Sequence, residues 1–203
     1  SSARILARSL NCLKSDKPTI EPCGKCNLCK EIEKGTALDI IEIDAASNTG
    51  VENIRELIEK AQFSPVQARW KVYVIDECHM LSTAAFNALL KTLEEPPSNT
   101  VFILATTDPQ RILQTILSRC QRFDFRRITV SSLINHLEMI ANKEKIDIDK
   151  ECIKLIAQRS EGGLRDAESL LDQLSLLKPP IKVQSVWELL GEVPELELID
   201  LIS

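Results

Sequence analysis

Four cysteines near the start of the chain have the spacing of a metal site. Cys12, Cys23, Cys26 and Cys29 read C-x10-C-x2-C-x2-C. Four thiolates can ligate one Zn²⁺ tetrahedrally, and the C-x2-C step is typical of structural zinc sites. Two disulfides would use the same residues in an oxidising compartment. The total of seven cysteines is odd and no secretory signal is visible, so the sequence favours a reducing cytosol and a structural zinc ion without a catalytic water.

A second group of candidate residues follows two apolar runs. Asp76 and Glu77 come directly after the run KVYVI, and Thr107 lies just beyond the run VFILA. Neighbouring parallel strands end at the same edge of a sheet, where ligands bind in open α/β folds. There Asp76 would hold Mg²⁺, Glu77 would orient or deprotonate the water that attacks a γ-phosphate, and Thr107 would reach the same water or phosphate. Acids after strands are also ordinary loop residues, and Thr107 could simply cap the next helix.

Two arginines are further candidates. Arg119 in SRC could remain solvated, or reach a neighbouring subunit and stabilise transition-state charge as an arginine finger. Arg165 in GGLRDA falls in the first turn of an expected helix, beside its apolar stripe. That side chain could reach a phosphate, or could pair with Asp166 or Glu168.

The expected elements alternate between strand and helix over residues 1–127, and are all helical from residue 128. Pro18 and Pro22 argue against a long helix in the cysteine loop. The apolar patterns predict strands at 38–43, 71–76, 101–105 and 122–125, and helices at 1–11, 51–63, from Ser82 to Pro96, and at 112–117. Three more helices are expected after Ser132, Asp149 and Gly163. This order predicts a parallel α/β sheet followed by a small all-α domain.

Composition excludes several classes of protein. The 203 residues suit one large or two small domains, and no apolar run is long enough to span a bilayer. A net charge of −5 and 4% aromatic residues offer neither a basic stripe nor a stacking surface. A zinc-ribbon module that binds nucleic acid is therefore disfavoured.

In this order the motifs resemble those of the gamma/tau family of bacterial DNA polymerase III clamp-loader subunits, which are AAA+ proteins with a RecA-like sheet. The strongest matches are EIDAASNTGVENIREL, KVYVIDECHMLSTAAFNALLKTLEEPP, FILATTDPQ, TILSRCQRF and EGGLRDAESLLDQ. The resemblance makes Asp76 and Glu77 the Walker B acids and Thr107 the sensor 1 residue. It also makes Arg119 the finger that acts on a neighbour's ATP and Arg165 the sensor 2 residue of the lid. The four cysteines match the family's inserted zinc module.

The resemblance also implies a domain plan and a set of partners. We expect an AAA+ core at 1–127 with the zinc module at about 12–30, a lid at 128–192 and the start of a collar at 193–203. The implied activity is ATP hydrolysis that loads a sliding clamp onto primer-template DNA, which helix starts such as 47–55 would contact. The implied partners are the other subunits of a hetero-pentameric ring, the clamp, and the polymerase core in the tau form, all in the bacterial cytoplasm.

One family motif is missing. The phosphate loop G-x-x-x-x-G-K-[ST] does not occur, and SSARILARSLNC is similar to the helix that should follow it. We therefore expect an N-terminally truncated AAA+ sheet that binds ATP poorly when it is isolated, because the backbone cradle and lysine for the phosphates are lacking. Two alternatives are a non-catalytic stator similar to the delta-prime subunit, and a structural zinc-containing fragment without ATPase activity.

Overall fold

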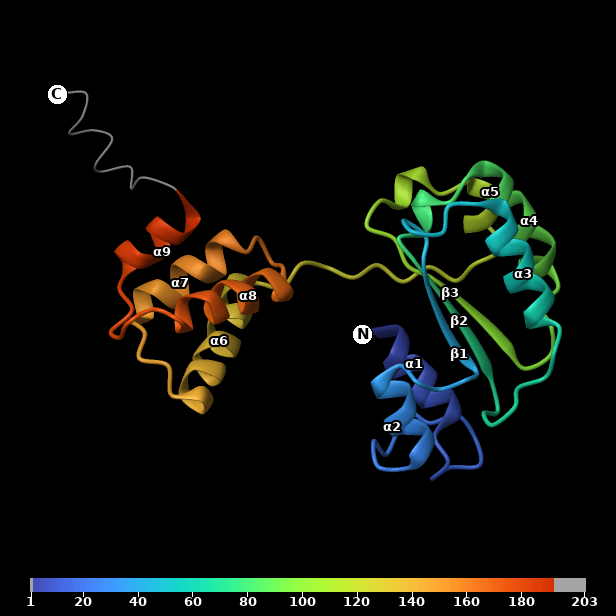
Figure 1. The fold of residues 1–203 in the computed structure, drawn as a ribbon, viewed down its shortest axis with the longest axis horizontal. Helices are drawn as coiled ribbons and strands as arrows, with labels where there is room; N and C mark the ends of the chain where they lie inside the picture. Colours follow the sequence, from blue (N-terminus) through green and yellow to red (C-terminus); the bar gives the residue numbers. More distant parts are fainter. Residues whose placement is uncertain (1, 192–203) are drawn as a thin grey trace. The chain divides into compact units, whose positions relative to one another are not determined.

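The computed structural model describes residues 2–191, which form two compact units divided between Arg122 and Phe123. The first unit contains a three-stranded sheet covered by helices, and the second unit is built from helices (Figure 1). This confirms the predicted parallel α/β sheet followed by an all-α unit. The predicted collar at 193–203 lies outside the described residues. Within residues 2–191, no helix is both long and apolar enough to cross a membrane.

The sheet consists of three parallel strands in the order β1-β2-β3. These strands are β1 (Ile40–Asp44), β2 (Lys71–Asp76) and β3 (Thr100–Leu104). The register places Asp44 opposite Asp76, so the acidic ends of β1 and β2 meet at the carboxyl edge. The central strand β2 is buried along its length up to Asp76, which explains its continuous apolar run.

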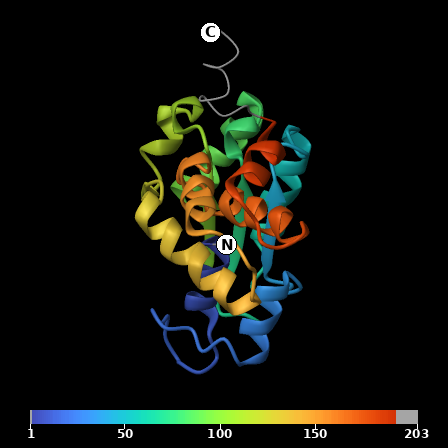
Figure 2. The same cartoon turned by 90° about the vertical axis from the view of Figure 1, so that its left-hand side faces the viewer.

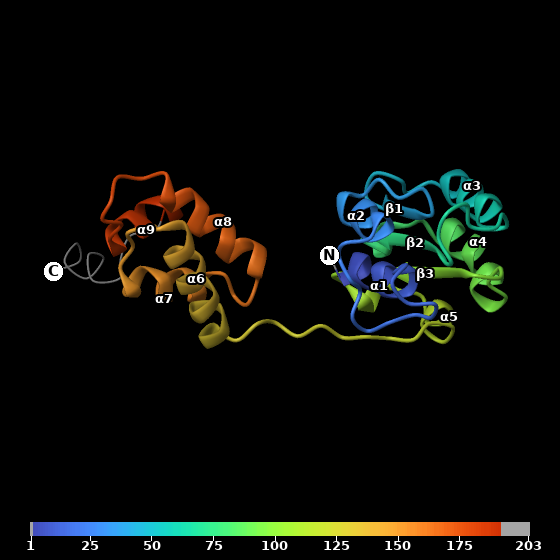
Figure 3. The ribbon, with the colours of Figure 1, turned by 90° about the horizontal axis from the view of Figure 1, so that it is seen from below.

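Alternate side chains of β2 contribute to two cores. On one face, Val72 and Val74 pack against α1 (Ser2–Asn11) and α2 (Asn27–Lys34). On the other face, Tyr73 and Ile75 pack with residues of the helices α3 (Val51–Ala61), α4 (Thr83–Glu94) and α5 (Gln114–Leu117). Figure 3 shows α1 and α2 on one side of the strands and α3 and α4 on the other. The helices therefore fix the strands from both sides, and the carboxyl edge remains open to loops.

Two features of the first unit differ from the sequence expectation. Helix α2 was not expected inside the cysteine loop; it begins where Cys26 Sγ accepts a hydrogen bond from Cys29 N. The strand predicted at 122–125 is wrong, because residues 121–129 form neither helix nor strand. A strand needs a partner for its backbone groups, and this segment pairs with no strand in the described chain. Phe123 and Phe125 are accordingly 69% and 82% exposed.

The second unit contains four helices among its described residues: α6 (Val130–Glu144), α7 (Lys150–Arg159), α8 (Leu164–Ser175) and α9 (Val183–Leu190). Figure 2 shows α6 in yellow beside α7 and α8 in orange. The first three match the predicted helices, although Thr129, and not Ser132, caps α6, and α9 was not predicted. They enclose a core of Leu133, Leu137, Ile153, Ile156, Leu171, Leu174 and Val186.

The turn before α8 requires a glycine. Gly162 has a φ of +84°, in the left-handed region. A Cβ at this position would lie 2.6 Å from Arg127 Cβ. Gly162 O also accepts a hydrogen bond from Ile128 N at 3.2 Å. Gly162 thus allows the turn before α8 to pack closely against residues 127 and 128 at the start of the second unit.

Candidate functional site

The structure brings the four predicted metal-ligating cysteines together. Cys12 follows α1, whereas Cys26 and Cys29 lie at the start of α2. The four Sγ atoms, including that of Cys23, all lie within 4.8 Å of one another. Sulfur ligands about 2.3 Å from one Zn²⁺ ion would lie about 3.8 Å apart in a tetrahedron. Small side-chain rotations are therefore enough to bring all four sulfurs to one ion.

The electrostatics of the cysteine cluster also suit a cation. The backbone N–H groups of Cys23, Cys26 and Cys29 each donate to a sulfur, at 3.3–3.4 Å. The N–H groups of Lys25 and Cys26 lower the pKa of the Cys23 thiol to about 6, whereas burial raises the pKa of Cys29 to about 12. A bound metal would compensate the buried negative charge of the thiolates. Four thiols with N–H donors and no open ligand position fit a structural zinc ion.

A buried asparagine, Asn11, joins the cysteine module to the sheet, and no sequence motif indicates this role. Asn11 Nδ2 donates to Trp70 O at 3.0 Å, and Trp70 N donates to Asn11 Oδ1 at 2.8 Å. Next to this pair, Arg69 donates to Cys12 O at 2.6 Å. The residue before the first cysteine is therefore tied to the segment that leads into β2.

A buried acid, Asp39, supports the same part of the sheet. Its carboxylate accepts hydrogen bonds from the backbone N–H groups of Val66, Gln67 and Ala68, each at 2.8 Å. Burial alone would raise the pKa of Asp39, but these donors, together with Lys71, outweigh burial and hold it below its ordinary value. An acid immediately before the strand segment IIEI is a signal that sequence reasoning could have used.

At the carboxyl edge of the sheet, Glu77 and Thr107 are in contact. Thr107 Oγ1 donates to Glu77 Oε2 at 2.9 Å, and Thr107 N donates to the same oxygen at 3.3 Å. Asp76 ends β2 beside them, and its Oδ1 accepts a hydrogen bond from Glu77 N at 3.1 Å. Glu77 has a φ of +47°, which a residue with a side chain adopts at an energetic cost. The strand ends thus place three of the predicted residues at one edge.

His79 supports this group from the short helix η1 (Cys78–Met80). Its Nδ1 lies 3.0 Å from Thr106 Oγ1 and 3.3 Å from Glu77 Oε2, and its side chain is 11% exposed. The imidazole thus lies between the side chains of Thr106 and Glu77, and among the described residues it belongs to no cluster of metal-ligating side chains.

The two predicted arginines have different surroundings. Arg119 forms an ion pair with Glu94 at the end of α4, and its Nη1 donates to Thr115 O at 2.7 Å. Arg165 is exposed in the first turn of α8, in the second unit. Within residues 2–191, no hydrogen bond or ion pair of the Arg165 guanidinium is present, so neither Asp166 nor Glu168 holds it.

The helix start expected to contact DNA has no side-chain cap. Gly50 is the N-cap residue of α3. Ser47 Oγ donates to Asp44 Oδ2 at 2.8 Å, and Asn48 Nδ2 donates to Asp44 O at 3.0 Å. The side chains of Ser47 and Asn48 therefore stabilise the turn after β1, and no side chain caps the start of α3.

The parallel sheet with acids at its carboxyl edge and the helical unit that follows it fit an AAA+-type fold. The RuvB Holliday junction branch migration motor of Thermotoga maritima shares this fold, with a TM-score of 0.61 at 19% identity over 79% of this chain and 55% of that chain. The chain itself belongs to the family of DNA polymerase III clamp-loader subunits. A family model described as DNA polymerase III, delta subunit, matches residues 1–129. A second model, described as the ATPase lid domain of the DNA polymerase III clamp loader subunit, matches residues 132–174.

Curated relatives support this family assignment. The DNA polymerase III subunit tau of Bacillus subtilis is 48% identical over 97% of this chain, and that of Escherichia coli is 47% identical over 100% of it. The subunit gamma of Buchnera aphidicola from Acyrthosiphon pisum is 48% identical over 95% of this chain. The chain spans 35%, 31% and 53% of these three relatives, respectively. The resemblance to gamma/tau subunits is therefore confirmed.

Proposed function

We propose that this chain is part of a gamma/tau-type subunit that hydrolyses ATP to load a sliding clamp onto primer-template DNA. The contact between Glu77 and Thr107 is the observation that supports this best. It holds a carboxylate at the edge of the sheet where nucleotides bind in α/β folds. Glu77 would orient the water that attacks the γ-phosphate, and Asp76 would hold Mg²⁺.

The hydrogen-bond pattern suits a water-orienting role for Glu77. The contacts from Thr107 and His79 all fall on Oε2. Within the described residues, Oε1 has no such partner and remains available to accept a hydrogen bond from water. Thr107 would thus act as a positioning residue that fixes the carboxylate, in agreement with its sensor 1 assignment.

The two arginines would contact the phosphates of ATP, and each would do so in a different way. As a finger, Arg119 would leave Glu94 and reach an ATP bound to the neighbouring subunit. Partly exposed ion pairs contribute about 0–1 kcal/mol, so the release of Arg119 from Glu94 would cost little. Arg165, without a partner in the described part of the chain, would contact a phosphate from the lid as the sensor 2 residue.

We further propose two inorganic cofactors and a nucleotide. Zn²⁺ would be a structural ion held by Cys12, Cys23, Cys26 and Cys29, and ATP with Mg²⁺ would be bound by the full-length protein. The 203 residues include no phosphate-loop motif, so we expect the isolated chain to bind ATP weakly. The partners would be the other subunits of a hetero-pentameric ring, the clamp, primed DNA and the polymerase core, in the bacterial cytoplasm.

A stator role is the second candidate. The family model that matches residues 1–129 is described as a delta subunit, and the non-catalytic delta-prime subunit shares the zinc module and the SRC motif with the gamma/tau family. The Glu77–Thr107 contact and the unpaired Arg165 favour the ATPase over the stator, since a subunit without turnover needs neither.

The substitution Glu77→Gln in the full-length protein tests the proposal. We expect ATP turnover to fall by about 100-fold or more while ATP affinity changes by less than about threefold, because the amide cannot accept a proton. Glu59→Gln, an exposed change of the same kind on α3, serves as the control and should leave turnover unchanged. Normal turnover in Glu77→Gln would exclude Glu77 as the water-orienting acid, and no turnover in the unaltered full-length protein would favour the stator.

A further inference from the structure

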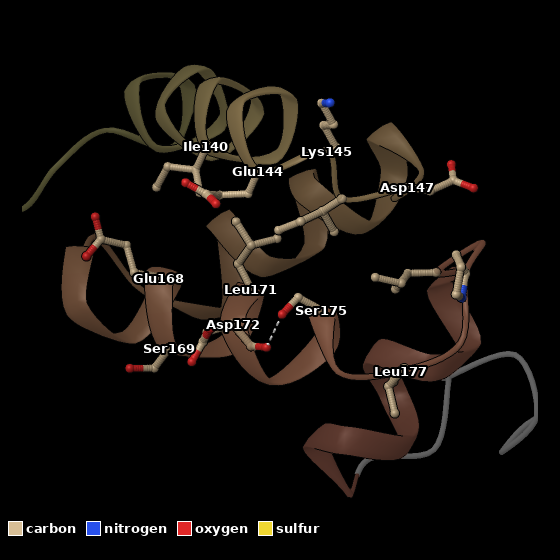
Figure 4. A pocket seen from close by; sticks show the side chains of 13 residues that line it. Ile140, Glu144, Lys145, Asp147, Glu168, Ser169, Leu171, Asp172, Ser175 and Leu177 are labelled. Carbon is tan, nitrogen blue, oxygen red and sulfur yellow. Dashed lines mark hydrogen bonds between the residues drawn. The ribbon is translucent and has the colours of Figure 1, made fainter.

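The second unit contains a hollow that no step of the proposed ATP cycle uses. Its volume is about 750 Å³, and it is lined by the end of α6, by α8, and by the loops that follow these two helices (Figure 4). The apolar part of the lining consists of Ile140, Ile146, Leu171, Leu177, Pro179 and Ile181. This volume is in the range of ligand-binding pockets and accommodates several apolar side chains.

The wall of the hollow is held in a defined shape. Ile181 N donates to Asp147 O at 3.0 Å, and Asp149 N donates to Ile181 O at 3.2 Å, so that the two loops form a β-bridge between Ile148 and Ile181. Leu171 is buried at the base, whereas Leu177 is 42% exposed at the side. An apolar surface that is already shaped, and partly exposed, favours an incoming apolar side chain.

The charged side chains around the hollow are mostly acidic. Glu144, Asp147, Glu168 and Asp172 are exposed residues of its lining, and Lys145 is the single basic residue among those that line it. Glu168 Oε1 lies 2.8 Å from His136 Nε2. Within the described chain, the other three acids form no ion pair. The hollow thus combines an apolar base with a negative rim.

We propose that this hollow is a docking site for a lysine- or arginine-rich amphipathic helix of another protein. Leucine-like side chains on one face of such a helix would fill the apolar base, as in other helix-in-groove complexes. Its flanking basic side chains would lie opposite Glu144, Asp147 and Asp172. Complementary charge at a rim chiefly sets the choice of partner and the rate of association.

The same charges argue against the two nearest alternative occupants. Residues 192–203 of this chain, EVPELELIDLIS, contain four acids and no base. A second copy of the chain carries the same net charge of −5. Like charges would oppose either occupant at this rim.

Two synthetic peptides of about 18 residues, roughly five helical turns, provide the test. Both have the same leucine stripe, with lysine in one peptide and glutamate in the other at the remaining positions. We expect the lysine peptide to bind the 203-residue chain with a Kd on the order of micromolar, and at least ten times more tightly than the glutamate peptide. The methyl NMR signals of Ile140, Ile146 and Ile181 should shift on binding.

Matched variants separate docking from general charge attraction. Glu144→Lys with Asp172→Lys should weaken binding of the lysine peptide about tenfold. Glu151→Lys with Glu188→Lys makes the same change of net charge on exposed residues outside the hollow, and should weaken it less than about twofold. Circular dichroism checks that each variant folds, and Asp147→Lys supplies an independent single change at the rim.

Several results would overturn the proposal. Equal weakening by the two double variants, or equal affinity for the two peptides, would show attraction without a specific site. Binding at least tenfold tighter to a chain that ends at Gly191 would make the chain's own segment the occupant. Self-association in analytical ultracentrifugation that Leu177→Asp abolishes would make a second copy the occupant.

Discussion

The cysteine cluster and the sheet edge differ in how much of the chain each site requires. All four sulfurs come from residues 12–29, and the helix that presents two of them starts at one of the cysteines. The sheet edge needs Glu77 and Thr107, which are 30 positions apart and meet only when β2 and β3 pair in register. A local site can form within a small module, whereas a distributed site depends on the whole sheet.

The cysteine module is nevertheless joined to the sheet, through the packing of α1 and α2 on β2 and through a few hydrogen bonds. Asn11 and Arg69 join the cysteine module to the segment before β2, and Asp39 holds the same segment from the start of β1. These contacts lie at the end of β2 opposite to Asp76. We therefore expect damage to the cysteine cluster to stay local, and damage to the connecting segment to destabilise the sheet.

Among the substitutions considered, loss of one cysteine should cause the largest change, in zinc content and in local order. We expect Cys26→Ser to reduce zinc from about one ion per chain to a small fraction, because structural zinc requires all four ligands. Serine can still cap α2, so the loss reports the missing thiolate. Structural zinc contributes on the order of 10 kcal/mol in small zinc modules, and the loop around α2 should therefore lose its order. Metal analysis by mass spectrometry and amide hydrogen exchange measure both effects.

The matched control for this change is Cys120→Ser, which removes a partly buried thiol outside the cluster and should keep one zinc per chain. Stoichiometric zinc in Cys26→Ser would contradict the four-thiolate site. If Cys26→Ser in the full-length protein reduced ATP turnover as strongly as Glu77→Gln does, the independence of the two regions would be refuted.

The substitution Asp39→Asn should have the next largest effect. We expect the free energy of unfolding to fall by about 2–4 kcal/mol, because hydrogen bonds to a charged acceptor contribute about 1.5–3 kcal/mol each and the amide replaces only part of them. Denaturant unfolding at pH 7 measures the loss. Asp44→Asn is the control. The Asp44 carboxylate also accepts a hydrogen bond from a backbone N–H, that of Ala46, but Asp44 is exposed. We therefore expect Asp44→Asn to lower the free energy of unfolding by less than Asp39→Asn does.

The pH dependence of stability provides a second readout for Asp39. Its pKa is lower in the folded than in the unfolded state, so its contribution is complete above the unfolded value of about 3.9 and is lost as the pH falls through the folded pKa. The decrease in stability between about pH 5 and pH 2 should therefore be shallower in Asp39→Asn than in the unaltered chain. An unchanged slope would mean that the three N–H contacts do not stabilise the carboxylate.

The sequence predicted local patterns well and tertiary partners poorly. Strand β2 could be predicted because burial on both faces produces a continuous apolar run. Helix α2 was not, because a cysteine sulfur caps it. The pairing of Arg119 with Glu94 joins residues 25 positions apart, and no side-chain pattern shows it. The alternation of Phe123 and Phe125 with polar residues predicts a strand at 122–125. A strand also needs a neighbouring strand to pair with its backbone, and the sequence pattern does not show whether one is present.

The substitution Thr107→Val in the full-length protein should have the smallest effect and sharpens the comparison most. Valine keeps the volume of the side chain but removes the hydroxyl that donates to Glu77 Oε2, whereas the backbone N–H of Thr107 still reaches that oxygen. One hydrogen bond to a charged group contributes about 1.5–3 kcal/mol, and the remaining donor should limit the loss of ATP turnover to about tenfold. Thr107→Ser restores the hydroxyl and should recover most of the activity, and both variants should keep one zinc per chain. If valine and serine gave equal turnover, the Thr107 hydroxyl would have no part in positioning Glu77.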